Sequence, residues 1–415
     1  MTAEIAIINK NAVALAADSA ITLRDPNTSK IYNTANKLFM LSKFEPVGVM
    51  VYGAAEFMAV PLETIIKMYR SHLGTQAFDT LTNYAEDFLK FLETNALLFP
   101  SDKQESWFSS IISRLYWSIR QSIDEKVKSE IAESPLAENR IEEITNEKID
   151  EYFKSWSSVS DLATWDAESE KALLAAYEAT ISKTIASVFE RLPVANRIEQ
   201  LKQLALFRIG KDFWPDSCGL VFAGFGTLDV LPCVKSYIIE VVVGDKVRYA
   251  PTPNLSNDMN EKASASIIPF AQAEIVYRFI RGIDPDYKRE IRRYLEALLC
   301  KEYPGKLIEQ VSTLVPEQDK QRVLDQLTEL GKNLTHNFDT DWDSLEWDKY
   351  VGPVIDIVAD LPKEDLAAMA ESLVNLTSFK RRISREAETV GGPIDVAVIS
   401  KGDGFIWIKR KHYFR

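Results

Sequence analysis

Residues 2–22 read TAEIAIINKNAVALAADSAIT, and this stretch decides how the fold begins. Two short runs rich in Ile, Val and Ala, residues 3–8 and 12–17, flank the polar segment Asn9-Lys10-Asn11. Asparagine tolerates the positive φ angles that tight hairpin turns often require. The pattern therefore predicts a β-hairpin whose turn is centred near Lys10.

Thr2 directly follows Met1 and precedes the first apolar run. If Met1 is removed, Thr2 carries a hydroxyl nucleophile and a free α-amine on the same residue. The α-amine of a peptide ordinarily has a pKa of about 7.7 to 8.0, so it can serve as a general base near neutral pH. With Met1 attached the amine is not free, so the predicted chemistry requires cleavage before Thr2.

A second hairpin is predicted from residues 37–41 and 47–52, which a short connection joins.

The residues that face each other in a hairpin can be predicted from the position of its turn. The numbers of two paired residues in an antiparallel hairpin have a nearly constant sum. A turn centred near Lys10 sets Asp18 opposite Thr2, within one residue of register.

The same argument applies to the second hairpin. A connection centred near Glu45 sets Lys37 opposite Gly53. If the open ends of the two hairpins adjoin, Thr2, Asp18, Lys37 and Gly53 meet.

These four residues form a coherent set for acyl transfer. The Lys37 ammonium would favour the neutral amine of Thr2, and Asp18 would keep that lysine charged and oriented. Backbone N–H groups where the strand ends at Gly53 would stabilise an oxyanion, and a small residue there lets a substrate backbone approach.

The rest of the chain alternates between helical and strand-like stretches. Helices are predicted for residues 78–215, 263–283, 287–345 and 351–385, with breaks at prolines that include Pro304 and Pro316, and strands for residues 219–226, 234–243, 247–250, 394–399 and 405–408. The order of hairpins, helices and strands predicts an α+β protein in which helix layers cover antiparallel sheets.

Composition excludes several classes of function. The chain has 415 residues and a formal net charge of -12, which argues against nucleic acid as a partner. Cys218, Cys233 and Cys300 have no metal-ligand spacing, so we expect reduced thiols, no metal and no cofactor. The Gly224-Phe225-Gly226 segment lacks the third glycine of a dinucleotide site. No apolar run is long enough for a membrane span, so we expect a cytoplasmic protein without a membrane partner.

The start of the chain resembles a known family. Residues 2–22 are similar to the beginning of the mature proteasome β subunits and their bacterial relatives, threonine proteases of the N-terminal nucleophile (Ntn) hydrolase superfamily. In that family a Val-x-x-Ala-Ala-Asp-Ser segment places its aspartate sixteen residues after the nucleophile, as Asp18 follows Thr2.

Three later segments extend the resemblance. Asn36-Lys37-Leu38 matches the family's lysine position, and Gly53-Ala54-Ala55-Glu56 resembles the stretch that supplies the oxyanion amide. Residues 390–399, VGGPIDVAVI, resemble the family's Gly-rich loop and penultimate strand. The resemblance implies a four-layer αββα sandwich of antiparallel sheets.

The sequence departs from the family pattern in four places. Lys37 lies a few residues late because the loop containing Pro26 is enlarged, so Lys30 is an alternative lysine. A one-residue shift leaves the amides of Gly53 and Tyr52 as alternatives for the oxyanion site. The family's Asp-x-x-Ser-Gly motif is not cleanly present. Ser264 and Ser266 both stand where its supporting serine would begin a helix.

The resemblance predicts a division of the chain into core and insertions. Residues 1–79, 216–283 and 346–415 are expected to form the Ntn core, and residues 80–215 and 284–345 to form two helical insertions.

The resemblance also implies a function, with two alternatives. We expect a proteasome-like threonine hydrolase that acts as a peptidase on peptide or protein substrates, or an amidase for a small acylated molecule. A catalytically silent protein that binds partners through its insertions is the other alternative. The insertions could also bind a regulatory protein or a second copy of the chain.

Overall fold

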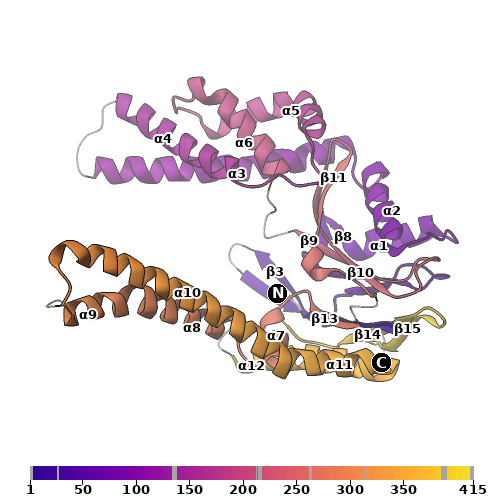
Figure 1. Ribbon diagram of the computed structural model, residues 1–415. Helices are drawn as coiled ribbons and strands as arrows, with labels where there is room; N and C mark the ends of the chain where they lie inside the picture. Colours follow the sequence, from indigo (N-terminus) through magenta and orange to yellow (C-terminus); the bar gives the residue numbers. More distant parts are fainter. Residues whose placement is uncertain are drawn as a thin grey trace. The chain divides into compact units, whose positions relative to one another are not determined.

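The computed structural model of the chain describes residues 3–25, 28–132, 138–211, 213, 217–260, 264–311, 314–384 and 390–411 (Figure 1). The fold is mixed, with helices and antiparallel sheets. It divides into two compact units. Unit 1 comprises Met1–Leu38, Val230–Cys233 and Asn257–Arg415, and unit 2 comprises Phe39–Asp229 and Val234–Ser256.

Unit 1 is built on a five-stranded antiparallel sheet of order β13-β1-β2-β14-β15. Its strands are β1 (Glu4–Asn9), β2 (Ala12–Ala17), β13 (Ala265–Pro269), β14 (Asp395–Ser400) and β15 (Gly404–Lys409). The predicted first and last hairpins are therefore confirmed. Because β2 pairs with β14, the two ends of the chain share one sheet.

The turn of the first hairpin is stabilised differently from the prediction. None of its three residues, Asn9, Lys10 and Asn11, has a positive φ. The Asn9 side-chain oxygen instead accepts the backbone N–H groups of Asn11 and Ala12, at 2.9 and 3.2 Å. Asparagine therefore acts here through its side chain, as in an Asx turn.

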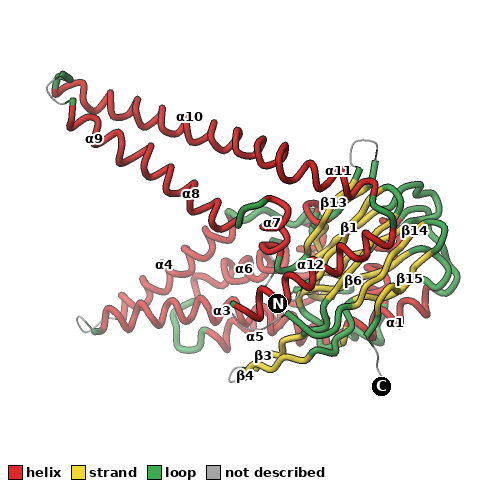
Figure 2. The backbone as a smooth tube through the Cα atoms, turned by 90° about the horizontal axis from the view of Figure 1, so that it is seen from below, coloured by secondary structure: helices red, strands yellow, loops and turns green. Residues whose placement is uncertain are grey.

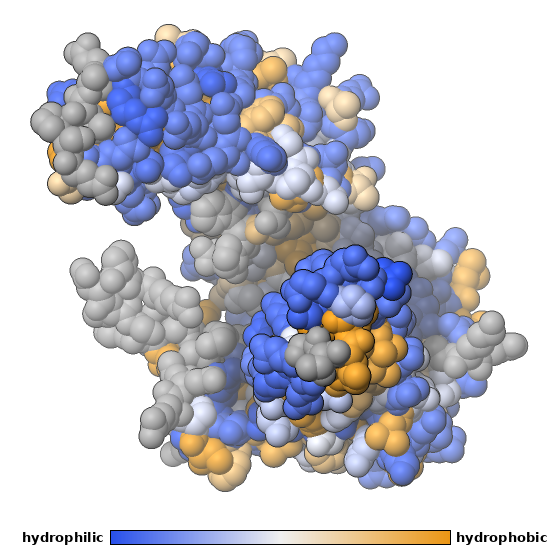
Figure 3. All heavy atoms as spheres, turned by 60° about the vertical axis from the view of Figure 1, so that its left-hand side comes forward, coloured by the Kyte–Doolittle hydropathy of each residue, from blue (hydrophilic) through white to orange (hydrophobic). Residues whose placement is uncertain are grey.

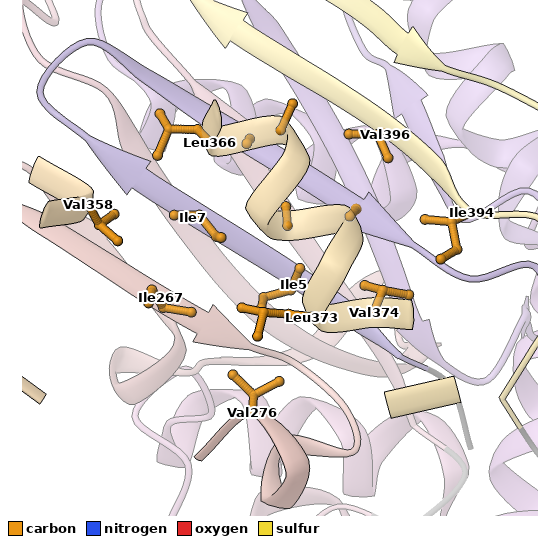
Figure 4. Packing of buried hydrophobic residues seen from close by; sticks show 14 of the residues in the cluster. Ile5, Ile7, Ile267, Val276, Val358, Leu366, Leu373, Val374, Ile394 and Val396 are labelled. Atoms are coloured by element: carbon orange, nitrogen blue, oxygen red, sulfur yellow. The ribbon is translucent and has the colours of Figure 1, made fainter. Parts of the chain in front are cut away.

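Helices cover one face of this sheet (Figures 2 and 4). They are α7 (Ala273–Arg281), α11 (Gly352–Asp360) and α12 (Lys363–Ile383). Leu366, Leu373 and Val374 of α12 pack with Ile5 and Ile7 of β1 in one buried cluster. The alternate side chains of β1 are also buried, and both faces of the strand are therefore shielded from solvent.

A long helical hairpin extends from unit 1 (Figure 1). It consists of α8 (Pro285–Ala297), the π-helical turn η3 (Leu298–Glu302) and α9 (Tyr303–Gln310), followed by the 3₁₀ turn η4 (Glu317–Asp319), α10 (Lys320–Glu346) and the π-helical turn η5 (Trp347–Val351). The predicted break at Pro304 is wrong, because the chain passes through a π-helical turn there. A proline lacks an N–H donor, and such a turn can absorb the lost bond without ending the helix.

Unit 2 contains a second antiparallel sheet, of order β11-β10-β9-β6-β5. Its strands are β5 (Leu38–Met40), β6 (Val47–Gly53), β9 (Cys218–Gly224), β10 (Cys233–Val243) and β11 (Lys246–Pro251). Helix α1 (Leu62–Leu73) precedes the predicted insertion of residues 80–215, and α2 (Leu81–Thr94) is its first helix. The Phe88 ring of α2 lies 5.5 Å from the Phe222 ring of β9, which seats this helix on the sheet.

The helical stretch between β6 and β9 continues with four further helices (Figure 1). They are α3 (Ser101–Ile131), α4 (Glu138–Ser157), α5 (Ala167–Val188) and α6 (Ile198–Gly210), with the 3₁₀ turn η1 (Ala195–Arg197) before α6. Their buried apolar side chains recur at helical spacing, and their outer faces are hydrophilic (Figure 3).

Several short elements complete the chain. They are the hairpin strands β3 (Ile21–Asp25) and β4 (Thr28–Tyr32), the hairpin strands β7 (Glu56–Phe57) and β8 (Val60–Pro61), the 3₁₀ turn η2 (Pro253–Leu255) and the strand β12 (Asn257–Asp258). Among the described helices, none is both long and apolar enough to cross a membrane.

The glycines of the Gly224-Phe225-Gly226 segment have a packing role. A Cβ at Gly224 would lie 1.9 Å from the Pro46 carbonyl oxygen, and one at Gly226 would lie 2.3 Å from that of Asp79. Close backbone approach therefore accounts for both glycines.

A charged cluster lies inside unit 2. The Glu240 carboxylate of β10 forms ion pairs with Arg208 of α6 and Arg248 of β11. Both guanidinium groups are fully buried and require counter-charge, and this carboxylate pairs with both.

We predict that Glu240→Ala destabilises the protein by about 3–5 kcal/mol, because it leaves two buried guanidinium groups without this counter-charge. The measurement is the midpoint of urea unfolding. As a control, Glu178→Ala removes an exposed partner of Lys202 and should leave the midpoint nearly unchanged. Equal midpoints for the two variants would contradict this assignment.

Candidate functional site

Asp18 is anchored to the first described residue of the chain. Its backbone N–H donates to the Ala3 carbonyl oxygen at 3.1 Å, and its Oδ1 accepts the Ala3 N–H at 3.0 Å. In the observed register Glu4 pairs with Ala17, so Asp18 lies opposite Ala3 and not opposite Thr2. The register differs by one residue from the central prediction, within its stated range, because the turn is centred between Lys10 and Asn11. Thr2 itself lies outside the described residues.

Lys37 binds two carboxylates in the interior of unit 1. Its Nζ lies 2.5 Å from Asp18 Oδ1 and 3.1 Å from Glu4 Oε1. All three side chains are buried. The predicted contact between Asp18 and Lys37 is therefore present, and Glu4 joins it from β1.

Sequence reasoning missed Glu4 as a member of this cluster. Its signal was available, because Glu4 is the one charged residue in an otherwise apolar run, residues 3–8. A buried carboxylate requires a partner, and a charge within a core strand indicates one elsewhere in the chain.

The Gly-rich loop, residues 390–393, also contacts Asp18. The Gly391 N–H donates to Asp18 Oδ2 at 2.9 Å, and Ala20 N–H donates to the same oxygen at 3.3 Å. The Ser19 hydroxyl donates to the Pro393 carbonyl oxygen at 2.6 Å. A carboxylate that accepts several N–H bonds is held in one orientation.

A second ion pair supports this loop and was not predicted. Lys411 Nζ lies 2.6 Å from Asp395 Oδ2 and donates to Ser19 Oγ and the Ala35 carbonyl oxygen, both at 2.8 Å. The Lys411 side chain is buried. It ties β14 and the segment before Lys37 to the residue after Asp18.

The alternative lysine cannot be compared in the same way. Lys30 belongs to β4, and its side chain lies outside the described residues, as does Pro26. The residues on either side of this position, 21–25 and 28–32, pair as the hairpin β3–β4.

Tyr52 and Gly53 end β6 in unit 2. Gly53 has φ +79°, and a Cβ there would lie 2.6 Å from the Ser217 carbonyl oxygen. Both facts explain why glycine occupies the position. The Tyr52 ring lies over Gly219, and the Tyr52 hydroxyl is 3.4 Å from Ser236 Oγ.

The helix start expected at the two candidate supporting serines is wrong. Ser264 precedes β13 and Ser266 lies within it, so neither begins a helix. Ser266 pairs with Ile8, and five residues at about 3.3 Å each place it roughly 16 Å along β1 from Ala3. The predicted helix of residues 263–283 starts only at Ala273, because alternating apolar residues form an edge strand first.

Within the described residues, no group of His, Cys, Asp and Glu side chains could hold a metal ion. The buried cluster consists of the Lys37 ammonium between the carboxylates of Asp18 and Glu4, next to Ala3.

No known protein family matches the chain, and no curated protein matches it significantly.

We predict that Lys37→Met destabilises the protein by about 3–5 kcal/mol, because it leaves Asp18 and Glu4 buried without their shared cation. Adding Glu4→Gln should recover about 1 kcal/mol or more, since it removes one of the two charges. Urea unfolding of the single and double variants measures this coupling. Lys67→Met, at an exposed ion pair with Glu63, is the control. Strictly additive effects of the two substitutions would contradict the shared ion pair.

We predict that Gly219→Ala destabilises unit 2 by about 1–3 kcal/mol, because its Cβ would lie 2.2 Å from atoms of the Tyr52 ring. The same substitution should cost much less in a Tyr52→Ala background. Gly402→Ala, where a Cβ meets open space, is the control. If the cost of Gly219→Ala does not depend on Tyr52, the steric account is wrong.

Proposed function

We propose that this protein is a threonine hydrolase of the Ntn type, and that Thr2 is its nucleophile once the bond before it is cleaved. One observation carries the proposal. Asp18 Oδ1 accepts the Ala3 N–H at 3.0 Å and lies 2.5 Å from Lys37 Nζ. Thr2 is bonded to that same Ala3 nitrogen, so a buried lysine lies close to the residue with the hydroxyl and the α-amine.

The proposed reaction has two halves. Thr2 Oγ attacks a carbonyl carbon while the α-amine takes the hydroxyl proton, and the amine then passes that proton to the leaving nitrogen as the C–N bond breaks. Water next attacks the resulting ester, again with the amine as base, and the acid leaves with Thr2 restored. The amide at Gly53, or that of Tyr52, would bind the oxyanion.

Lys37 and its two carboxylates have distinct roles in this proposal. The Lys37 ammonium favours the neutral α-amine, and Asp18 orients that ammonium through an oxygen that also holds Ala3. Glu4 is a second counter-charge for Lys37 inside the unit.

We also propose the four-layer αββα arrangement. In unit 1 the cluster of Ile5 and Ile7 faces helices, while Ala6 and Ile8 on the other face are equally apolar. In unit 2 Phe222 faces α2, while Val221 and Met50 form the alternate, apolar set. Each of the two sheets has helices on one face and apolar side chains on the other. If the sheets pack together through these apolar faces, both faces of each sheet are shielded from water.

A non-enzymatic interaction protein is the second candidate, and one observation favours it. The helical hairpin of unit 1 exposes large apolar side chains, among them Leu314 at 80%, and apolar surface gathers at its free end (Figure 3). Exposed apolar patches of this kind often mark partner surfaces. The buried cluster of Lys37, Asp18 and Glu4 next to Ala3 argues against a role in partner binding alone.

We predict that a peptide epoxyketone forms a covalent adduct at Thr2, because that reagent requires both the hydroxyl and the free amine of an N-terminal threonine. Intact-protein mass spectrometry before and after exposure measures the loss of Met1 and the adduct. Thr2→Ala and Lys37→Ala should abolish the adduct, whereas Lys30→Ala and the exposed control Lys67→Ala should not.

Three results would change the proposal. Adduct formation that survives Thr2→Ala would exclude Thr2 as the nucleophile. Retained Met1 without an adduct would favour the interaction protein. Loss of Met1 with no peptide adduct, but turnover of small acyl amides, would favour an amidase over a peptidase.

A further inference from the structure

The turn between β13 and α7 lies beside the start of β1. The two strands are antiparallel and Ile5 pairs with Pro269, so each residue toward the start of β1 lies one residue nearer to α7. The Phe270 N–H continues this pattern by donating to the Glu4 carbonyl oxygen at 3.0 Å. Residues 271 and 272 follow, and α7 begins at Ala273. The first turn of α7 is therefore brought to the beginning of the chain.

Packing holds α7 against the same end of β1. Val276 of α7 belongs to one buried cluster with Ala3 and Ile5 (Figure 4). Gln272 stands four residues before Val276, at the end of α7 that the β13 turn brings to β1. Because Thr2 is bonded to the Ala3 nitrogen, Gln272 is a candidate neighbour of the proposed nucleophile.

Gln272 has a backbone conformation that glutamine rarely adopts. Its φ and ψ are 52° and 44°, in the left-handed region, at the N-cap position of α7. Residues other than glycine are uncommon there, and Asn, Asp and His are the usual exceptions. With the described residues of α7, its side chain makes no capping hydrogen bond. Helix capping therefore does not explain this glutamine, and strained positions of this kind cluster at functional sites.

The side-chain oxygen of Gln272 is a buried acceptor. From the part of the chain that the structure describes, Oε1 receives no hydrogen bond. A buried polar atom without a partner is costly, and native proteins nearly always supply one. The α-amine of a processed Thr2 is an N–H donor of the required kind.

The charged groups near Ala3 and on α7 set the background for such a contact. Lys37 lies between Asp18 and Glu4, and Glu274 of α7 accepts a hydrogen bond from Arg381 at 2.6 Å. A further carboxylate beside the α-amine would hold a proton on it and so oppose its use as a base. A neutral amide oxygen accepts an N–H from the ammonium and from the free amine alike.

We propose that Gln272 Oε1 accepts an N–H of the Thr2 α-amine once Thr2 is the first residue, and thereby directs the amine's lone pair toward the Thr2 hydroxyl. Gln272 is then a positioning residue for the general base. This meaning for catalysis rests on the proposed function. The contact itself requires only a free α-amine.

The test measures the pKa of the Thr2 α-amine without using catalysis. The full chain is made behind a removable fusion partner that is cut directly before Thr2, so that every variant has a free α-amine. Cyanate carbamoylates only the neutral amine, and peptide mass spectrometry follows the rate at Thr2 against pH. The midpoint of this profile is the pKa of the amine.

Substitutions of Gln272 should move this pKa in opposite directions. Gln272→Glu should raise it by about one unit or more, a tenfold change in the ionisation constant, because a carboxylate favours the ammonium. Gln272→Met has a similar length but no oxygen, and it should lower the pKa, since Oε1 binds the ammonium more strongly than the amine. Gln326→Glu, at an exposed position of α10, is the control and should leave the pKa unchanged.

The backbone conformation supplies variants that keep the fold. Gln272→Gly removes the amide at a φ that suits glycine, so the midpoint of urea unfolding should stay the same or rise. Its epoxyketone adduct at Thr2 should nevertheless form about tenfold or more slowly, as for one lost hydrogen bond of about 1.4 kcal/mol. Gln272→Asn tolerates the same φ and keeps a shorter amide, and it should retain part of the rate.

An amine pKa that is the same in the wild type and in the Glu and Met variants would overturn the inference. An adduct rate that is unchanged in Gln272→Gly would overturn it as well. If the pKa follows the substitutions but the wild type forms no adduct, the hydrolase is refuted and the contact stands. If the adduct forms at Thr2 and no Gln272 variant changes its rate or the pKa, the contact alone is refuted.

Discussion

The organisation of unit 1 depends on the buried ammonium of Lys37, which lies between the carboxylates of Asp18 and Glu4. Both carboxylates are buried beside this one ammonium, and burying a carboxylate without a counter-charge is costly. The two oxygens of Asp18 extend the cluster, because one binds Ala3 and the other binds Gly391. A single charge cluster thereby holds together the first strand, the segment before β5 and the loop that leads into the closing hairpin.

Two helical segments, one formed by α3 to α6 in unit 2 and the other by the long helical hairpin of unit 1, differ in how they bury apolar surface. Helices α3, α4, α5 and α6 of unit 2 form one segment that buries its own apolar side chains. The hairpin of unit 1 has only two helical arms and leaves large apolar residues exposed. A two-helix hairpin cannot enclose a full core. The first segment therefore encloses its own apolar side chains, whereas the second leaves apolar surface exposed.

Local pattern predicted the strands and helices well where each pattern was long. The hairpin of β1 and β2 and that of β14 and β15 follow directly from apolar runs bounded by Asn or Gly. It failed at β13, where small residues and a short apolar run resembled a helix start, and at Pro304, where a π-helical turn replaced the expected break. In both cases local propensity was decided by pairing and packing partners distant in sequence.

By itself, the sequence determined most of the elements and the first hairpin, because hairpin geometry relates residues that are close in the chain. The contact between Asp18 and Lys37 was predicted only on the condition that two hairpins adjoin, and the tertiary structure supplies that contact. Only the tertiary structure decided that Glu4 joins that pair, that Gly391 and Lys411 bind around Asp18 and Ser19, and that Glu240 lies between two arginines. Most of these contacts join residues separated by tens to hundreds of positions. They depend on which faces of the sheets and helices pack, and no pattern within a short window encodes that choice.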